Sequence, residues 1–379
     1  MARLPAFDFD RAPFLVIWEM TRACALACVH CRANAIPWRD PREMTTEEGF
    51  RLIDQVAAFG NPPPLFVLTG GDPMRRPDLA ELVRYAVSKS LIVALTPSGT
   101  AAVTRRKLVE LKEAGLSRIA VSLDGADANT HDAFRRVSGS YDWTMRIIRT
   151  AGELGLPLQI NTTVSRITLP SLEAMARRVK NFHVALWAVF FLVRTGRGAS
   201  IDQVSPDQCE QVLNWLYNIS LTAPFGIKTT EAPHFHRVTW QRDRELGRHL
   251  IAGAPRRRAL LRSPRSVSDG NGFVFVDHLG EIYPSGFLPV SRGNARMGDL
   301  AATYRDDEIF RRLRDADGLT GKCGRCEFRE ICGGSRARAY AATGSLMASD
   351  PLCTYDPGTI VQPPVSGTPT PQGPQPVSG

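Results

Sequence analysis

One unit recurs along the first half of the chain: a short apolar run, a loop and an amphipathic helical segment. The six apolar runs are FLVIWEM (14–20), LFVLTG (65–70), LIVALT (91–96), RIAVSLD (118–124), LQINTTV (158–164) and LWAVFFLV (186–193). They are rich in Val, Ile, Leu and Phe and alternate little, as do strands that are buried on both faces. Strands that alternate with helices favour right-handed βαβ units. The pattern therefore predicts an α/β fold with a parallel sheet, either open or curled into part of a barrel.

The remaining sequence divides into shorter units. Residues 205–220 and 241–262 read as helices, GFVFVDHLGEIYP (272–284) as a hairpin, and 307–318 as a short helix. A cysteine-rich segment follows at 321–355, and the tail has no capacity to form a core. We predict a barrel at 10–200, a helical bridge at 201–264, a small domain at 265–356 and a disordered tail at 357–379.

Composition limits the function classes. The 379 residues carry 47 Lys+Arg and 38 Asp+Glu, a net charge of +9 that is compatible with an acidic substrate. Basic runs such as 255–265 come without a nucleic-acid motif, so we expect no nucleic-acid partner. No stretch approaches a membrane span, and the N-terminus lacks the apolar run of a signal peptide. We therefore expect no membrane partner and a cytoplasmic protein, whose cysteines serve metals or catalysis rather than disulfides.

Seven of the eight cysteines fall into two groups. Cys24, Cys28 and Cys31 stand in CALACVHC, directly after the first predicted strand. A structural zinc site needs a fourth ligand, which His30 or a distant residue would have to supply. A four-iron cluster normally takes one cysteine per iron, so three cysteines leave one iron open to an exogenous ligand. The eighth, Cys209, lies in a helical pattern and is expected to be a buried apolar residue.

CxxxCxxC after the first strand of a six-unit β/α domain resembles the radical S-adenosylmethionine (SAM) enzymes. The resemblance implies a [4Fe-4S] cluster whose open iron binds SAM. It also implies that reductive cleavage of SAM yields a 5′-deoxyadenosyl radical, which abstracts a hydrogen atom from the substrate. The fold it implies is a partial (β/α)6 TIM-like barrel with a small C-terminal α+β iron–sulfur domain.

Further motifs at the strand ends carry the same resemblance. TGGDP follows the second strand, TPSG the third, SLDG the fourth, INTTV the fifth, and LVRTGRG ends the sixth. His30 holds the place where family members often carry an aromatic residue that packs near adenine. The SAM-contacting residues that the resemblance implies are Gly70, Gly71, Asp72, Ser98, Ser122, Asp124, Asn161 and His30, the last by stacking. Asp72 and Ser98 replace the usual Glu and Asn. No catalytic side chain is assigned.

The second group, Cys323, Cys326, Cys332 and Cys353, resembles the C-terminal SPASM region of radical SAM enzymes that modify peptides and cofactors. These four fill the ligand set of one auxiliary [4Fe-4S] cluster. The positions expected to hold a second auxiliary cluster carry Ser285, Ser335 and Arg336. We therefore predict one auxiliary cluster, as in reduced "twitch" variants. A structural zinc held by the same four cysteines is the alternative.

The sequence motifs do not identify the substrate. We expect a peptide or small cofactor precursor, with a reductant such as ferredoxin or flavodoxin. Modification of tetrapyrrole propionates, as in alternative heme synthesis, is the named alternative, and a non-catalytic iron–sulfur electron carrier is a third. EAPHFHR (231–237), with His234 and His236, reads as a loop, either lining the substrate cavity or on the surface.

Overall fold

The computed structural model describes residues 8–247 and 266–359. The strands are β1 (Leu15–Glu19), β2 (Leu65–Thr69), β3 (Ile92–Leu95), β4 (Arg118–Ser122), β5 (Leu158–Val164), β6 (Leu186–Phe191), β7 (Gly226–Thr230), β8 (Phe273–Val276) and β9 (Ile282–Tyr283). The helices are α1 (Thr46–Ala57), α2 (Leu79–Ser88), α3 (Arg105–Glu113), α4 (Ala128–Arg135), α5 (Ser140–Glu153), α6 (Leu172–Lys180), α7 (Pro206–Thr222), α8 (His234–Glu245), α9 (Leu300–Asp306), α10 (Glu308–Arg314), α11 (Gly321–Gly324) and α12 (Arg336–Thr343). All six predicted strands are present.

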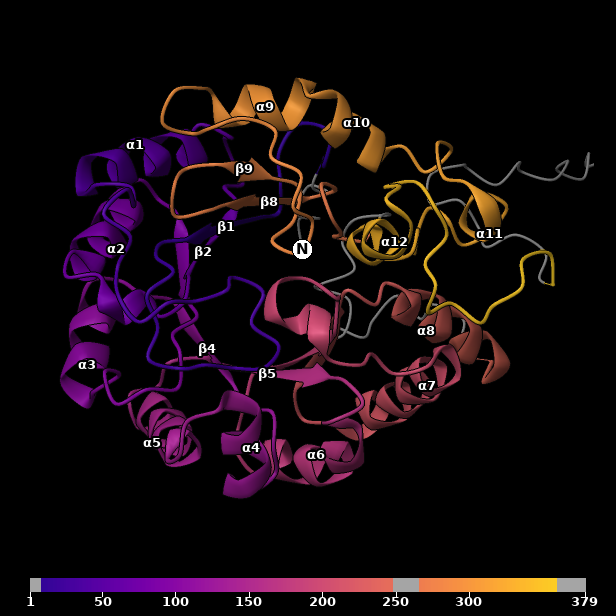
Figure 1. The fold of residues 1–379 in the computed structure, drawn as a ribbon, viewed down its shortest axis with the longest axis horizontal. Coiled ribbons are helices and arrows are strands. Elements are labelled where there is room, and N and C mark those ends of the chain that lie inside the picture. Colours follow the sequence, from indigo (N-terminus) through magenta and orange to yellow (C-terminus); the bar gives the residue numbers. More distant parts are fainter. Residues whose placement is uncertain (1–7, 248–265, 360–379) are drawn as a thin grey trace, which may run out of the picture.

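The strands form one curled sheet with the order β7-β6-β5-β4-β3-β2-β1-β8-β9. Every neighbouring pair is parallel except β8 and β9. Figure 1 shows helices α1 to α6 around the outer side of the curve, as in a partial barrel. The predicted α/β class and partial barrel are therefore confirmed, and the loops after the parallel strands meet at one edge of the sheet.

Successive side chains of each strand point to opposite faces of the sheet, and the two faces differ in burial. On the outer face, Trp18, Phe66 and Trp187 are fully buried in a continuous core beneath the helices. On the inner face, residues such as Asn161 and Lys228 remain half-buried. Local signals place the helices: Thr45 and Glu48 form a capping box at the start of α1.

Three elements differ from the prediction. The segment expected as a purely helical bridge contains β7, which extends the sheet beyond β6. EAPHFHR is not a loop, because α8 begins at His234. Helix α4, a short helix capped by Asp127, was not predicted. The second bridge helix ends at Glu245, and residues 246–247 form a turn. The rest of its predicted range from 248 on, with the basic run 255–265, lies outside the described residues, as does the tail beyond 359.

The predicted hairpin at 272–284 is confirmed, but it is part of the barrel sheet. Strand β8 pairs with β1 in parallel, with Ile17 opposite Phe275. Val274 and Val276 of β8 belong to the same apolar core as the barrel strands. The cysteine segment after α10 is therefore attached to the barrel by a shared sheet and core.

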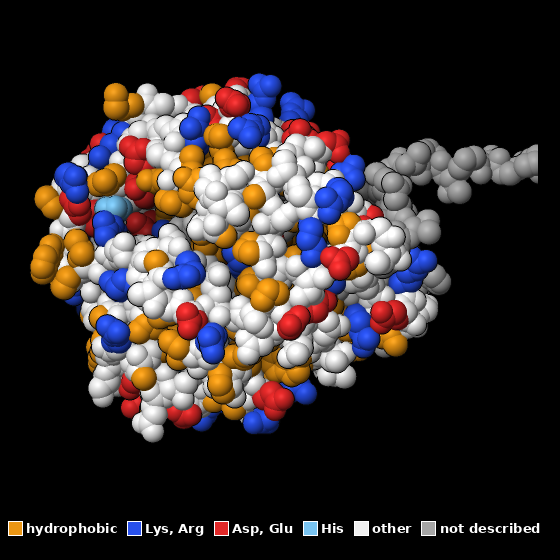
Figure 2. Space-filling model, turned by 45° about the vertical axis from the view of Figure 1, so that its right-hand side comes forward, with side chains coloured by type: hydrophobic (Ala, Val, Ile, Leu, Met, Phe, Trp, Pro, Cys, Tyr) orange, Lys and Arg blue, Asp and Glu red, His pale blue; other side chains and the backbone are white. Residues whose placement is uncertain are grey.

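Charge and hydrophobicity are dispersed over the face drawn in Figure 2, where basic side chains stand among acidic ones. The net charge of +9 is therefore not gathered into one basic surface on that face. Within residues 8–247 and 266–359, no helix is long and apolar enough to cross a membrane.

Candidate functional site

The three-cysteine loop lies at the carboxyl end of β1. Cys24 and Cys28 are buried, and Cys31 is half-buried. Each sulfur lies near at least one N–H donor: the Leu26 amide is 3.3 Å from Cys24 Sγ, the Ala35 amide 3.5 Å from Cys31 Sγ, and Arg135 Nη1 3.5 Å from Cys28 Sγ. Donors of this kind stabilise thiolates that bind an iron–sulfur cluster.

Contacts from other strand ends hold the loop. Ser98, after β3, lies with Oγ 3.3 Å from Cys24 Sγ. Arg197, after β6, donates from Nε to the Cys28 carbonyl at 2.9 Å and from Nη1 to the Ala35 carbonyl at 3.0 Å. Residues far apart in the sequence therefore converge on the cysteine loop, as the parallel strands predict.

The glycines after β2 pack against this loop. A Cβ on Gly70 would stand 2.5 Å from the Thr21 carbonyl oxygen, and one on Gly71 2.6 Å from that of Ala23. The Gly71 amide donates to the Thr21 carbonyl at 2.7 Å. Contact with the loop backbone alone is thus enough to require glycine here.

Asp72 links the ends of β2 and β3. Its side chain is fully buried. Oδ2 accepts from Thr100 Oγ1 at 2.8 Å, and Oδ1 from the Met74 amide at 3.2 Å. Burial raises the pKa of this carboxyl, which the hydrogen bonds partly oppose. The structure therefore gives Asp72 a positioning role, and direct contact with SAM remains a prediction.

Asp124, after β4, forms a buried ion pair with Arg135 of α4. Burial opposes its ionisation, but the guanidinium of Arg135 holds its pKa below the usual range. Oδ1 also accepts from the Thr163 amide at 2.6 Å, so the ends of β4 and β5 are tied together. Arg135 thus connects this carboxylate to Cys28.

Three other predicted contacts lie at the same edge of the sheet. His30 stacks on Phe134, with ring centroids 4.4 Å apart, so one face of its imidazole is covered by protein. Burial and Arg135 lower the pKa of His30 to about 3, and its ring is neutral. Ser122 and Asn161 lie opposite each other on β4 and β5, and both are half-buried. Contact of His30, Ser122 and Asn161 with SAM remains a prediction.

The four C-terminal cysteines line one pocket. Cys323, Cys326, Cys332 and Cys353 share it with His234 and Arg237 of α8. The thiol pKa values of Cys326, Cys332 and Cys353 are raised, mainly by burial. Four convergent thiols fit a closed iron–sulfur cluster, and they equally match the donor set of a zinc site.

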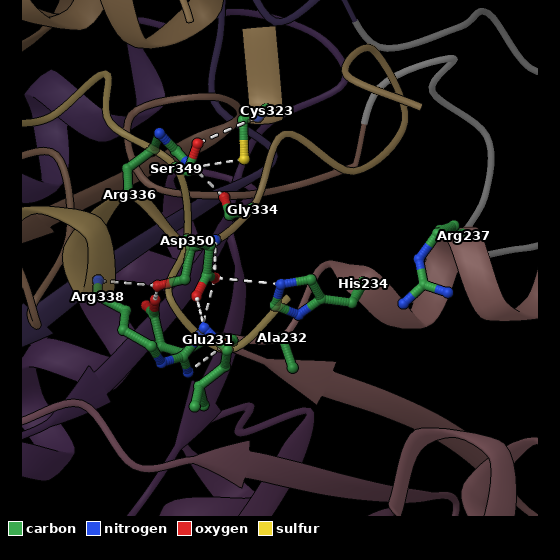
Figure 3. Close-up of polar contacts among 12 residues, drawn as sticks. Glu231, Ala232, His234, Arg237, Cys323, Gly334, Arg336, Arg338, Ser349 and Asp350 are labelled. Carbon is green, nitrogen blue, oxygen red and sulfur yellow. Dashed lines mark hydrogen bonds and ion pairs between the residues drawn. The ribbon is translucent and has the colours of Figure 1, made fainter. Parts of the chain in front are cut away.

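A buried polar network lies beside the second pocket. Figure 3 shows Asp350 between His234 of α8 and Arg338 of α12. His234 Nε2 is 3.3 Å from Asp350 Oδ2, and Arg338 Nη1 is 2.9 Å from the same oxygen. Burial opposes ionisation of Asp350, but Arg338 and His234 hold its pKa far below the usual range. The network fixes α8, which follows the barrel edge, against α12.

The serines at the positions of a second auxiliary cluster are engaged within the protein. Ser335 is buried, and its Oγ donates to Glu231 Oε2 at 2.5 Å. Ser285 is also buried and accepts from the Phe287 amide at 3.2 Å. Both hydroxyls therefore have protein partners.

The sequence interpretation missed Arg135, Arg197, His234 and Arg237 as parts of these sites. Arg197 stands in LVRTGRG, directly after a predicted strand, and that position was a usable signal. Arg135 lies on the unpredicted α4, and the two α8 residues belong to a segment that was interpreted as a loop.

A partial β/α barrel with a three-cysteine loop after its first strand and a four-cysteine pocket defines a class of iron–sulfur enzyme. Residues 18–179 match the profile of the radical SAM superfamily. The chain belongs to this superfamily and is a radical SAM enzyme. A [4Fe-4S] cluster and SAM are its cofactors.

Relatives of known function extend over nearly the whole chain. The AdoMet-dependent heme synthase of Oleidesulfovibrio alaskensis is 41% identical over 92% of this chain and 89% of its own. Mycofactocin maturase of Mycolicibacterium smegmatis is 28% identical over 91% of this chain and 84% of its own. Among solved structures, Streptococcus suis SuiB superposes with a TM-score of 0.69 at 15% identity, over 91% of this chain and 78% of that one. This last likeness concerns the fold.

Proposed function

We propose that this enzyme acts in SAM-dependent heme synthesis, by abstracting a hydrogen atom from a propionate side chain of an iron tetrapyrrole. Similarity to a heme synthase over most of both chains supports this class of substrate. This similarity reverses the ranking of candidate substrates from the sequence motifs, which placed a peptide or small cofactor precursor first and tetrapyrrole propionates second. A propionate is an anion, so the inner face of the barrel should offer cations to bind it.

The structural observation that carries this proposal is the position of Lys228 inside the barrel. It lies on the inner face of β7, opposite Ala188 of β6. Burial and the nearby Arg118 lower the pKa of its ammonium group. Among the described residues, no acidic side chain pairs with Lys228 or Arg118. A carboxylate from the substrate would therefore compensate the burial of the Lys228 ammonium group and its repulsion by Arg118.

The two cysteine groups would hold two clusters in this proposal. Cys24, Cys28 and Cys31 would hold the SAM-binding [4Fe-4S] cluster, and cleavage of SAM there supplies the 5′-deoxyadenosyl radical. The predicted SAM contacts at the ends of β2 to β5 and His30 would orient the cofactor beside the loop. The four C-terminal cysteines would hold one auxiliary [4Fe-4S] cluster. A reductant such as ferredoxin or flavodoxin would supply the electron for cleavage.

A peptide precursor is the second candidate. Mycofactocin maturase aligns with nearly all of this chain, and SuiB, whose fold is similar, has been solved bound to its precursor peptide. Lower identity to the maturase than to the heme synthase places this candidate second.

The test supplies the reconstituted enzyme with SAM, a reductant and iron-coproporphyrin III. We expect 5′-deoxyadenosine to form together with a porphyrin whose propionates are altered, as measured by mass spectrometry. Lys228→Met should raise the KM for the porphyrin several-fold, Lys228→Arg should raise it less, and SAM cleavage without substrate should stay unchanged. SAM cleavage with an unaltered porphyrin would contradict the tetrapyrrole proposal, and absence of cleavage would favour an electron carrier.

A further inference from the structure

The wall of the four-cysteine pocket contains one buried cation from outside the cysteine segment. Arg237 of α8 lines the pocket with the cysteines and is 3% exposed. The other two Lys or Arg residues of the wall, Lys322 and Arg329, have side chains that are 39% and 36% exposed, and they pair with Asp356 and Asp317. Solvent screens a charge such as that of Lys322, whereas the charge of Arg237 acts through a less polar surrounding.

The guanidinium of Arg237 is held from the side of α7. Nη1 and Nη2 donate to the two carboxylate oxygens of Glu210 at 2.9 and 2.5 Å, and Nη1 also donates to Gln241 at 2.7 Å. Its position over the Tyr355 ring, 5.2 Å from the centroid, fixes the plane further. Nε is buried and has no hydrogen-bond partner within the described residues. The Nε–H donor of this oriented guanidinium thus remains unused.

Electrostatics connects this guanidinium to two of the cysteines. Burial opposes the charge of Arg237, but Glu210 and the sulfurs of Cys353 and Cys332 raise its pKa. Burial raises the thiol pKa of these cysteines, and Arg237 opposes that effect. The cation therefore lies where it stabilises negative charge on the two sulfurs.

We propose that Arg237, oriented by Glu210, is a positioning residue that raises the reduction potential of the auxiliary cluster through its charge and its unused Nε–H. The inference rests on the proposed function, since it requires the cluster. A four-iron cluster that accepts one electron becomes more negative by one charge. A nearby cation and hydrogen bonds to the sulfurs favour that reduced form, and both raise the potential.

A purely structural role for Arg237 gives a different pattern of results. If the ion pair only ties α7 to α8, removing either partner should have the same effect. If Arg237 acts on the cluster, Arg237→Gln should lower the potential, whereas Glu210→Gln keeps the cation and should not lower it. Arg244→Gln, on the exposed side of the same helix, is the matched control.

The experiment is a redox titration of the full chain by electron paramagnetic resonance. Cys24, Cys28 and Cys31 are replaced by Ala, so that only the C-terminal cluster contributes a signal. We expect a more negative midpoint potential for Arg237→Gln, a smaller shift in the same direction for Arg237→Lys, and none for Arg244→Gln. If Arg237→Gln does not retain the cluster, the midpoint potential of Arg237→Lys becomes the test. An unchanged midpoint potential in Arg237→Lys then overturns the inference.

Iron analysis separates failure of the inference from failure of the proposed function. Full cluster occupancy with an unchanged potential in Arg237→Gln overturns the inference alone. If Arg237→Gln and Glu210→Gln lower the midpoint potential equally, or lose equal amounts of iron, the inference is also overturned. The ion pair would then only hold α7 against α8. If the parent chain binds no iron at the C-terminal cysteines, the auxiliary cluster is wrong and the inference fails with it.

Discussion

Arg197 Nε donates a hydrogen bond of 2.9 Å to the backbone carbonyl of Cys28, although 169 residues separate them. The loop after the sixth strand thereby holds the loop after the first. The backbone amide of Arg197 also donates to the Cys31 carbonyl at 3.0 Å. A flexible cysteine loop would have to be ordered when a cluster binds, and these contacts order it beforehand.

Arg197→Ala should loosen the cysteine loop, because two carbonyls lose their donor. We expect the free energy of unfolding to fall by roughly 1–3 kcal/mol and the N-terminal cluster to be lost more readily to a chelator. Chemical denaturation and iron release measure the two effects. Arg194→Ala is the control, because within the described part of the chain its side chain donates only to the Ala199 carbonyl, in its own loop. Equal effects of both variants would contradict this role of Arg197.

Metal content tests the number of clusters. Three and four cysteines predict two four-iron clusters, so anaerobically reconstituted protein should contain about eight irons per chain. About twelve irons would show that Ser285 and Ser335 do not prevent a further cluster. About four irons with one zinc would show that the C-terminal site is not iron–sulfur.

Replacement of Cys24, Cys28 and Cys31 by Ala should abolish reductive SAM cleavage. It should leave the C-terminal cluster in place, because that pocket is formed by separate residues. Chromatography of 5′-deoxyadenosine and iron analysis measure both outcomes. Formation of 5′-deoxyadenosine at the unmutated rate would mean that SAM is cleaved elsewhere.

Cys353→Ala should remove or weaken the C-terminal cluster and spare SAM cleavage. Metal bonds at Cys332 and Cys353 would close the loop between them, so their loss should increase hydrogen exchange within residues 321–355. Strands β8 and β9 should stay protected, since β8 pairs with β1. Turnover of the true substrate should fall.

Cys209→Ala is the matched control for Cys353→Ala. Cys209 is 1% exposed in the apolar core, so its replacement should leave the iron content unchanged and cost only packing energy. The assignment of roles to the two clusters would be reversed if SAM cleavage disappeared in Cys353→Ala while the N-terminal cluster remained intact.

The sequence by itself determined the six barrel strands, the position of the cysteine loop and the expected burial of Cys209. Local patterns suffice for these features, because buried parallel strands are continuous apolar runs and the loop follows one of them directly. The short β8–β9 hairpin was also visible as two β-rich runs around a turn.

Only the tertiary structure decided which distant segments complete these features. The apolar run of β8 carries no sign that it pairs with β1, because pairing between distant strands depends on the whole sheet. His234 and Arg237 reached the cysteine pocket only because α8 packs against the C-terminal segment. Lys228 became a candidate ligand for a carboxylate once its face of β7 was known, since a one-residue shift in register would reverse that face.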